Sequence, residues 1–342
     1  MTAPSQMFTE AAQAPARVAA QLASNRELMA DAVARLETLD PPFAITIARG
    51  SSDHAAAFAK HLFETRLGLP TLSQSPSVAT LYRATSEKLR GTLALAISQS
   101  GRSPDLIETA IAAREKGALL IAMVNDAYSP LAREADILVP LHAGEERSVA
   151  ATKSYVASLV AVADLAARWG RDAALAAALD AIEPALDDAW AADWGAMVDA
   201  LATTQRLLVL GRGSTAPIAA EAALKFKEVA QIHAEAFSSA EVAHGPMALV
   251  REGDPVFAFA PQDAAAAGFT DRLDALAQRG ARIIGAGVAD AAVALPVART
   301  ADPAIDAIGM ALSFYRAAEA LARRRGLDPD DPPHLSKVTR TR

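Results

Sequence analysis

Cysteine is absent from this chain of 342 residues, and that absence excludes several kinds of chemistry. Without thiols the protein forms no disulfide, no thiolate nucleophile and no cysteine-based metal site. Basic runs are also scarce, because the longest is Arg323-Arg324-Arg325 and the net charge is -7. A basic groove for nucleic acid or for an anionic membrane is therefore not expected, and an anionic ligand would have to be held by local groups.

Long hydrophobic runs are missing as well. The first residues lack the basic start and apolar core of a signal peptide, and the apolar stretch from Val156 to Ala163 is interrupted by Asp164 before it reaches membrane-spanning length. We therefore expect a soluble, unprocessed, cytoplasmic protein with no membrane partner. Because 52% of the residues are hydrophobic, the chain can fill two medium domains, each with its own core.

What the chain does contain is an internal repeat. Arg49-Gly50-Ser51-Ser52 matches Arg212-Gly213-Ser214-Thr215, at an offset of 212 − 49 = 163 positions. Two further pairs match at the same offset, namely 93–97 with 256–260 and 116–122 with 279–285. Three matches in one register favour two copies of one fold.

Each copy alternates short apolar runs with longer helical patterns. In the first copy, strands are predicted over 43–48, 70–74, 93–98, 119–124 and 136–140, and helices over 53–66, 103–116 and 151–169. Short, continuously apolar strands that alternate with helices indicate a parallel sheet covered on both faces. The predicted fold is α/β, with two tandem doubly wound domains.

The expected domain boundaries follow from these patterns. They are an N-terminal helical segment over 1–42 with one leading helix over 5–38, a first domain over 43–170, a helical connection over 171–205, a second domain over 206–326 and a C-terminal tail over 327–342. Prolines in the first half of the tail prevent a helix there.

A charged helix face in the second copy is the first candidate for chemistry. Glu221, Lys225 and Glu228 are spaced i, i+4 and i+7, so one face would carry two carboxylates and an ammonium. The preceding strand and its Gly211-Arg212-Gly213 turn place this face just past the carboxyl end of a strand, where open α/β folds bind ligands. The alternative is an exposed Glu–Lys pair with a structural role only.

Two hydroxyl-rich loops follow strands of the first copy. One is Gly50-Ser51-Ser52, and the other is Ser98-Gln99-Ser100-Gly101-Arg102-Ser103, in which Ser103 suits a helix N-cap and Pro104 the first helical position. Backbone N–H groups, hydroxyls and a helix N-terminus together bind anions, so a phosphate fits. Thr152-Lys153-Ser154 is a candidate third polar turn. The same residues are also ordinary caps and turn formers, and no Walker-type lysine follows the glycines.

The remaining candidates are weaker on their own. His244, in a His-Gly-Pro turn, can titrate near neutral pH, and His54 is explained equally well as a helix-start residue. His233 and Glu235 would point apart on a helix with no third ligand nearby, so no metal is predicted. Lys337, near the end of the non-helical tail, is most simply a solvated lysine.

Taken together, eight ordered motifs resemble the SIS (sugar isomerase) proteins, in particular the isomerase half of glucosamine-6-phosphate synthase and the SIS-type glucosamine-6-phosphate deaminases. The likeness covers nearly the whole chain from about residue 17 onward. The motifs are Arg49-Gly-Ser-Ser52, Ser98-Gln-Ser-Gly-Arg-Ser103, Val149-Ala-Ala-Thr-Lys153, Gly211-Arg-Gly213, Glu221 to Glu228, His233-Ala-Glu235, His244-Gly-Pro246 and Leu335-Ser-Lys337.

This resemblance implies a tandem SIS protein that forms a homodimer with shared active sites and binds a hexose 6-phosphate without a cofactor. It implies that Glu228 moves a proton between C1 and C2, that His244 opens the sugar ring and reaches the site from the partner subunit, and that Lys337 closes over the sugar, where in the synthase it can form an imine with a ketose. The implied substrate-binding residues are Gly50, Ser51, Ser52, Ser98, Gln99, Ser100, Ser103, Ala150 and Lys225.

The chain also departs from the synthase pattern. Synthases carry an N-terminal glutaminase domain with a terminal cysteine, and this sequence shows neither, so glutamine is not expected as the ammonia source. Arg102 and Ala243 stand where the synthase usually has Glu and Lys. The resulting hypothesis is a glucosamine-6-phosphate deaminase that yields fructose 6-phosphate and ammonia. A fructosamine-6-phosphate deglycase, another phosphosugar isomerase and a non-catalytic sugar-phosphate sensor stay open as alternatives.

Overall fold

The computed structural model describes residues 4–337, which fall into two compact units. Each unit contains one parallel sheet. The first-sheet unit comprises Ala16–Glu146, Lys153–Asp180 and the tail from Ser336, and the second-sheet unit comprises the residues up to Pro15, Arg147–Thr152 and Ala181–Leu335. Among the described residues, no helix is both long enough and apolar enough to span a bilayer.

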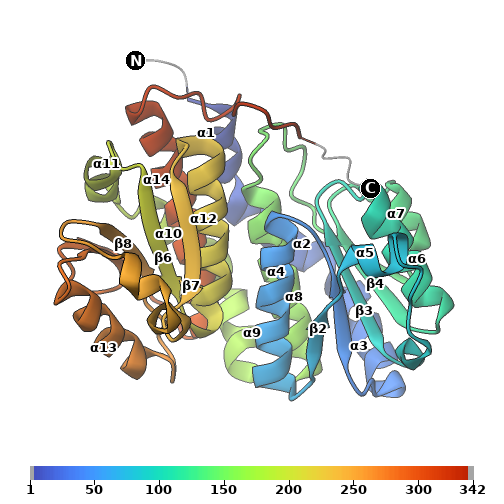
Figure 1. The fold of residues 1–342 in the computed structure, drawn as a ribbon. Coiled ribbons are helices and arrows are strands. Elements are labelled where there is room, and N and C mark those ends of the chain that lie inside the picture. The colour runs from blue at the N-terminus through green and yellow to red at the C-terminus, as the bar shows by residue number, and fades with distance from the viewer. Residues whose placement is uncertain (1–3, 338–342) are drawn as a thin grey trace. The chain divides into compact units, whose positions relative to one another are not determined.

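The first sheet has five parallel strands in the order β2-β1-β3-β4-β5. They are β1 (Ala44–Ile47), β2 (Thr71–Ser73), β3 (Leu93–Ser98), β4 (Leu119–Val124) and β5 (Ile137–Pro140), each within a few residues of its predicted range. Every residue of β1 and β3 is buried, as expected for strands covered on both faces. Figure 1 shows β2, β3 and β4 of this sheet between helices.

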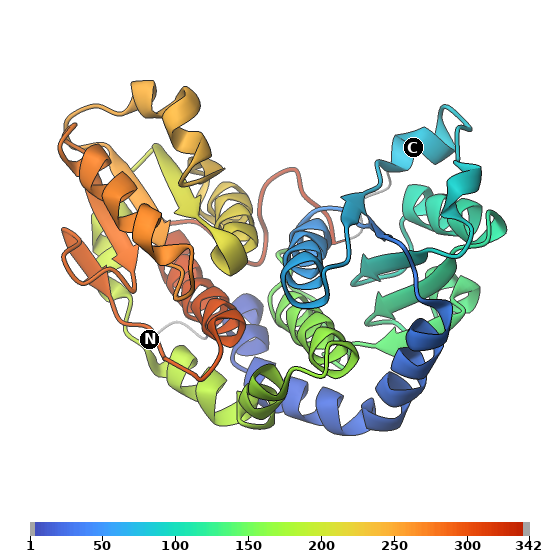
Figure 2. The same ribbon diagram turned by 90° about the horizontal axis from the view of Figure 1, so that it is seen from below.

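The helices of the first-sheet unit form two groups. Their bounds are α2 (Ala14–Ser24, whose first two residues fall in the second-sheet unit), α3 (Arg26–Leu39), α4 (Ser51–Leu62), α5 (Pro76–Thr80), α6 (Pro104–Glu115), α7 (Pro130–Glu134), α8 (Lys153–Trp169) and α9 (Ala173–Asp180). Helix α8 packs against α3, α4 and α9, whereas α6 packs against α5 and α7 (Figures 1 and 2). A π-helical turn, Phe63–Leu67, continues α4, and a 3-10 helix covers Glu87–Leu89.

The second sheet repeats the first. Its parallel strands are β6 (Arg206–Gly211), β7 (His233–Ser238), β8 (Pro255–Phe259), β9 (Arg282–Ala286) and β10 (Val293–Leu295), in the order β10-β9-β8-β6-β7. Read from β7, this is the order of the first sheet with each strand replaced by its counterpart. The duplication predicted from the repeat is therefore confirmed.

The second-sheet unit is held by an aromatic core between helices and sheet. Its helices are α1 (Gln6–Ala11), α10 (Ile182–Ala191), α11 (Gly195–Leu201), α12 (Ala216–Ala230), α13 (Ala266–Ala277) and α14 (Pro303–Arg324), with 3-10 helices at Gly213–Thr215, Glu241–His244 and Pro246–Leu249. Helix α12 packs against α14, and the ring of Phe226 lies 5.0 Å from that of Phe314 and 5.8 Å from that of Phe257. This packing fixes the orientation of α12, which carries the charged face.

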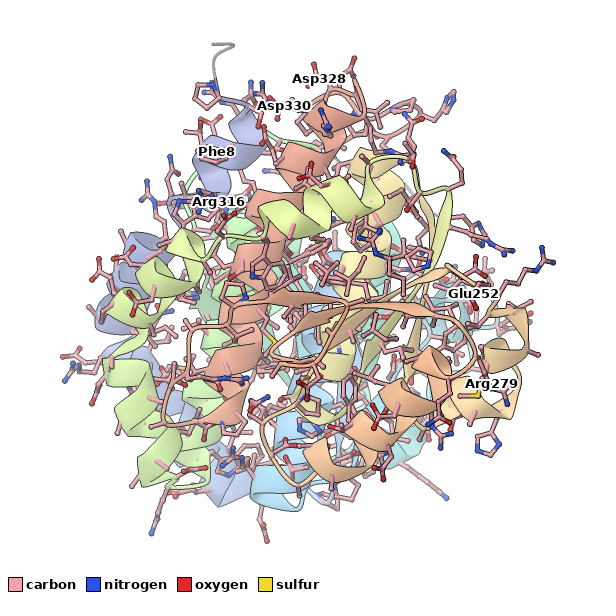
Figure 3. All side chains as sticks on the ribbon, turned by 90° about the vertical axis from the view of Figure 1, so that its left-hand side faces the viewer. Phe8, Glu252, Arg279, Arg316, Asp328 and Asp330 are labelled. Atoms are coloured by element: carbon pink, nitrogen blue, oxygen red, sulfur yellow. The ribbon has the colours of Figure 1, made fainter. Side chains whose placement is uncertain are left out.

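Two predictions about the ends of the chain have different outcomes. The single leading helix over 5–38 is wrong, because the structure has α1, α2 and α3 there. At the break before α3, Asn25 is buried and its amide donates to the carbonyl of Pro140 at 2.8 Å, an anchor that no helical periodicity reveals. Over its described residues, 327–337, the tail is non-helical, as predicted for its first half, and Asp330 accepts hydrogen bonds from the backbone N–H groups of Gln6 and Met7 at the start of α1 (Figure 3).

Candidate active site

The two hydroxyl-rich loops of the first-sheet unit begin at neighbouring strand ends. Strands β1 and β3 are paired with Ile47 opposite Ala96, so their carboxyl ends meet at one edge of the sheet. The chain passes from β1 to β2 on one side while β3 lies on the other, which makes this edge the topological switch point where doubly wound folds bind ligands. An ion pair links the two loops: Arg49 directly precedes the first loop, and its guanidinium donates to Oδ2 of Asp105, which lies just after the second loop, at 3.0 and 3.1 Å.

The loop after β3 is shaped by its own hydroxyls. Ser98 Oγ accepts a hydrogen bond from the N–H of Gly101 at 3.0 Å, and Ser100 Oγ accepts one from the N–H of Arg102 at 3.3 Å. Gly101 has φ +61°, and a Cβ there would lie 2.1 Å from Ser129 Oγ. A side chain at this position would be strained and would collide with Ser129, so the turn that carries the serines needs glycine here.

Two helix N-termini face the same edge. Ser103 is the N-cap of α6 and Pro104 its first residue, as predicted, but the Ser103 hydroxyl makes no capping hydrogen bond. Gly50 is the N-cap of α4, and Ser51 and Ser52, both half-buried, form its first turn. The first N–H groups of a helix lack intrahelical partners and carry the positive end of its dipole, so this edge offers backbone and hydroxyl donors to an anion.

Arg102, which departs from the synthase pattern, is turned to a neighbouring loop. Its guanidinium pairs with Asp126 Oδ2 at 2.7 Å. Partial burial raises the pKa of Asp126, but hydrogen bonds from Arg102 and from the backbone of Tyr128 outweigh it and hold that pKa below its usual value. Arg102 is thus paired with a carboxylate of the same unit, although its side chain is half-exposed.

The third polar turn is engaged by the protein itself. Lys153 is buried and its Nζ donates to the carbonyl of Glu145. Ala150 is also buried, in the segment Arg147–Thr152 that belongs to the second-sheet unit. That segment is held by the carboxylate of Glu10, which accepts from the backbone of Arg147 at 2.6 Å. Substrate contact by Ala150 stays a prediction.

Lys337 is not simply solvated, contrary to the interpretation from its surroundings in the sequence. Its Nζ lies 3.2 Å from Glu146 Oε2, and both residues belong to the first-sheet unit. The Glu146 side chain is fully buried and also accepts from the backbone N–H of Ser154 at 3.1 Å and from its hydroxyl at 2.5 Å. Sequence reasoning missed Glu146, because no local pattern links it to a lysine so far along the chain.

The charged face of α12 forms as the spacing predicts, but it is not exposed. Lys225 Nζ contacts Glu228 Oε2 and lies 3.4 Å from Glu221 Oε1. Lys225 and Glu221 are each 1% exposed, whereas the Glu228 side chain is 20% exposed. The alternative of a solvated structural pair is therefore wrong.

Two carboxylates keep the buried ammonium charged. Burial by itself lowers the pKa of Lys225, but the negative charges of Glu221 and Glu228 and their hydrogen bonds outweigh it and raise that pKa above the usual lysine value. Lys225 is therefore an ammonium at neutral pH. The partly exposed Glu228 is the member of the group that a ligand can reach.

The histidines lie in two different settings. His244 ends the 3-10 helix Glu241–His244 and is exposed, next to Gly245 at φ +140°. His233 and Glu235 lie on strand β7, not on a helix, so they share one face of the strand instead of pointing apart. With Arg206 and Asp254 they line a pocket of about 160 Å³ that includes the amino ends of β6, β7 and β8, the opposite edge from the ligand-binding edge of such sheets.

Comparison with known proteins agrees with this architecture. The model of the SIS domain matches residues 43–168 and 200–318. A glutamine–fructose-6-phosphate aminotransferase (isomerizing) from Halobacterium salinarum is 33% identical over 317 residues, which cover 85% of this chain and 50% of that protein. The corresponding protein from Thermococcus kodakarensis is 31% identical over 97% of this chain and 57% of its own length. The chain thus spans about half the length of these relatives.

Solved structures give the same result. A proposed phosphosugar isomerase from Silicibacter pomeroyi is 42% identical, with a TM-score of 0.91 over 96% of this chain and 100% of that one. The C-terminal domain of glucosamine-fructose-6-phosphate aminotransferase from Francisella tularensis is 26% identical, with a TM-score of 0.82 over 96% of this chain and 99% of that one. A glucosamine-6-phosphate deaminase from Thermotoga maritima shares the fold, at 20% identity and a TM-score of 0.75 over 98% of this chain and 100% of its own. With two matched domains, two sheets of one topology and these relatives, the chain belongs to the SIS domain family.

Proposed function

We propose that this chain is a phosphosugar isomerase of the deaminating kind, which converts glucosamine 6-phosphate and water into fructose 6-phosphate and ammonia. The observation that carries the proposal is the Glu221–Lys225–Glu228 group, in which a buried ammonium holds a carboxylate that remains accessible. Aldose–ketose exchange needs a positioned base beside C1 and C2, and Glu228 is suited to that role.

The reaction has three steps. Ring opening, assigned to His244, exposes the C1 aldehyde next to the C2 amine. Glu228 then removes the C2 proton while O1 gains one, which leaves an enolamine, and returns a proton to C1 while the amine loses one, which leaves an imine at C2. Water adds to this imine, the C–N bond breaks, and ammonia leaves with the ketose as the second product.

The phosphate supplies the binding energy that places the reacting carbons. The donors at the ends of β1 and β3, including the unengaged cap position of Ser103 and the first turn of α4, suit a dianion. Energy from this non-reacting end of the substrate can be used to position C1 and C2 against the base. Loss of the phosphate should therefore lower kcat as well as raise KM.

Lys337 and His244 complete the proposed site. Glu146 holds the Lys337 ammonium on the first-sheet unit, the unit that carries the hydroxyl loops, which supports a role for this lysine beside the sugar. His244 is exposed, which is compatible with its reaching a sugar bound to a second copy of the chain. We propose a homodimer with shared sites on this basis.

One alternative is favoured by a specific comparison. The 42% identical structure from Silicibacter pomeroyi is that of a proposed phosphosugar isomerase. The same base and phosphate loops would then interconvert an aldose and a ketose 6-phosphate with a hydroxyl at C2, through an enediol.

The test is to incubate the full chain with glucosamine 6-phosphate and to measure fructose 6-phosphate and ammonium together. Equal amounts of both products are expected. The absence of both products would refute the deaminase proposal. Glucose 6-phosphate and fructose 6-phosphate in deuterated water form the parallel arm, because deuterium uptake there without deamination of the amino sugar would establish the alternative.

A further inference from the structure

The charged group of α12 has a further hydrogen-bonding partner on the neighbouring helix α14. Tyr315, on α14, is fully buried, and its hydroxyl donates to Glu221 Oε1 at 2.9 Å. The same oxygen lies 3.4 Å from Lys225 Nζ. A continuous series of polar contacts thus runs from the core through Glu221 and Lys225 to Glu228, whose side chain is partly exposed.

The Lys225 ammonium interacts with the carboxylates of both Glu221 and Glu228. Lys225 touches Glu228 more closely than Glu221, although Glu221 is the more deeply buried anion and would attract a cation strongly in its low-dielectric surroundings. The Tyr315 hydroxyl supplies Glu221 with a hydrogen bond that does not come from Lys225. Loss of this hydrogen bond would increase the attraction of Glu221 Oε1 for the ammonium and so weaken the contact of Lys225 with Glu228.

We propose that Tyr315 is a positioning residue, which acts through Glu221 to keep Lys225 directed at the carboxylate of Glu228. This proposal rests on the assignment of Glu228 as the base that transfers the C2 proton. Tyr315 does not touch the sugar. It sets how firmly the base is held, so its loss should lower kcat for proton transfer while leaving the binding of the phosphosugar nearly unchanged.

The matched pair of variants is Tyr315→Phe and Ser313→Ala. Each removes one buried hydroxyl from α14, and Ser313 Oγ donates instead to the carbonyls of Ala189 and Gly309, away from the charged group. A merely structural role of the α14 hydroxyls would affect both variants alike. For Tyr315→Phe we expect kcat for C2 deuterium exchange to fall about tenfold with KM within about twofold, the loss expected for a hydrogen bond to a charged group. Ser313→Ala should keep kcat within about twofold.

A spectroscopic readout separates this proposal from the assignment of the activity. Slowly exchanging lysine ammonium groups give ¹H–¹⁵N signals, and Lys225 is buried between two carboxylates; the signal is assigned as the one missing from Lys225→Met. In Tyr315→Phe that signal should shift or broaden, and in Ser313→Ala it should stay in place.

Each result decides something definite. An unchanged Lys225 signal in Tyr315→Phe, or no Lys225 signal in the wild type, would overturn the positioning role whether or not the enzyme deaminates glucosamine 6-phosphate. If the Lys225 signal changes in Tyr315→Phe but the enzyme shows no C2 exchange, the positioning of Lys225 is supported and the proposed function is refuted. Equal losses of kcat in both variants would show that Tyr315 is structural only.

Discussion

Replacing Lys225 with methionine should cost the second-sheet unit about 3–5 kcal/mol of unfolding free energy, the range observed when one partner of a buried ion pair is removed. The structure places Lys225 Nζ 3.4 Å from Glu221 Oε1 and in contact with Glu228, with Lys225 and Glu221 each 1% exposed. Coulomb's law with an effective dielectric constant of about 20 gives about 5 kcal/mol for charges at that distance, and the cost of desolvating the charges offsets part of this gain. Methionine fills a similar volume but leaves two carboxylates without their cation.

The assay is urea unfolding followed by tryptophan fluorescence in a Trp169→Phe background. The chain has three tryptophans, and the other two, Trp190 and Trp194, both lie in the second-sheet unit, so the signal reports that unit. Lys227→Met is the matched control, because Lys227 is an exposed lysine of the same helix whose Nζ donates to the carbonyl of Ala234. That control should cost less than about 1 kcal/mol.

The pH dependence follows from the raised pKa of Lys225. A raised folded-state pKa means that the stabilisation is complete below the ordinary lysine pKa and is lost as the pH rises through the folded value. The stabilisation that Lys225 contributes to the wild type should therefore be present at neutral pH and be lost only at strongly alkaline pH. A loss below about 1 kcal/mol at neutral pH would refute the reasoning, as would equal effects of the Lys225 and Lys227 variants.

Three further predictions concern the proposed base Glu228, the tail and the loop after β3. Glu228→Gln should lower C2 deuterium exchange by at least about 100-fold while phosphosugar binding, measured by calorimetry, stays within about threefold. Glu146→Gln removes the charge that holds the tail lysine, so limited proteolysis should cut the tail several-fold faster, roughly as expected for the loss of a partly buried ion pair. Gly101→Ala should destabilise the protein by about 2–3 kcal/mol, because its Cβ would lie 2.1 Å from Ser129 Oγ at a left-handed φ; Gly253→Ala, with positive φ but open space, should cost about 1 kcal/mol.

Contrary outcomes are equally specific. Retained exchange in the Glu228 variant would assign the base elsewhere, and an unchanged cleavage rate in the Glu146 variant would show that the ion pair does not hold the tail. Equal costs at Gly101 and Gly253 would mean that backbone conformation alone, and not contact with Ser129, requires glycine in the loop after β3.

Much of the fold could be predicted because its signals are local. The buried strands are continuous apolar runs and the helices between them have ordinary lengths, so β1, β3, α4 and α6 lie close to their predicted ranges. The leading helix could not be divided correctly, because the break before α3 depends on a hydrogen bond from Asn25 to Pro140, far away in the sequence. The assignment of His233 and Glu235 to a helix was wrong because β7 is an edge strand in which only the first three residues alternate between exposed and buried, a pattern too short to separate a strand from a helix.

The candidate site divides in the same way. The spacing of Glu221, Lys225 and Glu228 fixes that they share a helix face, since 3.6 residues complete a turn, and the serines follow strands whose ends meet once the sheet is parallel. The spacing does not determine whether that face is exposed to solvent or buried. All of the predicted catalytic and substrate-binding roles, the ring-opening role of His244 and the substrate contact of Ala150 among them, stay predictions.

By itself, the sequence determined the duplicated α/β architecture, the hydroxyl loops at one sheet edge and the charged face of α12, because each follows from backbone geometry and hydrogen bonding within short segments. Only the tertiary structure decided that Lys225 is buried, that Tyr315 lies behind Glu221 and that Glu146 holds Lys337. The last two contacts join residues 94 and 191 positions apart, and such pairs are set by the packing of whole elements against one another. The sequence determines the charges and their spacing. The low dielectric constant that strengthens the interactions between these charges arises only when the sheets and helices pack.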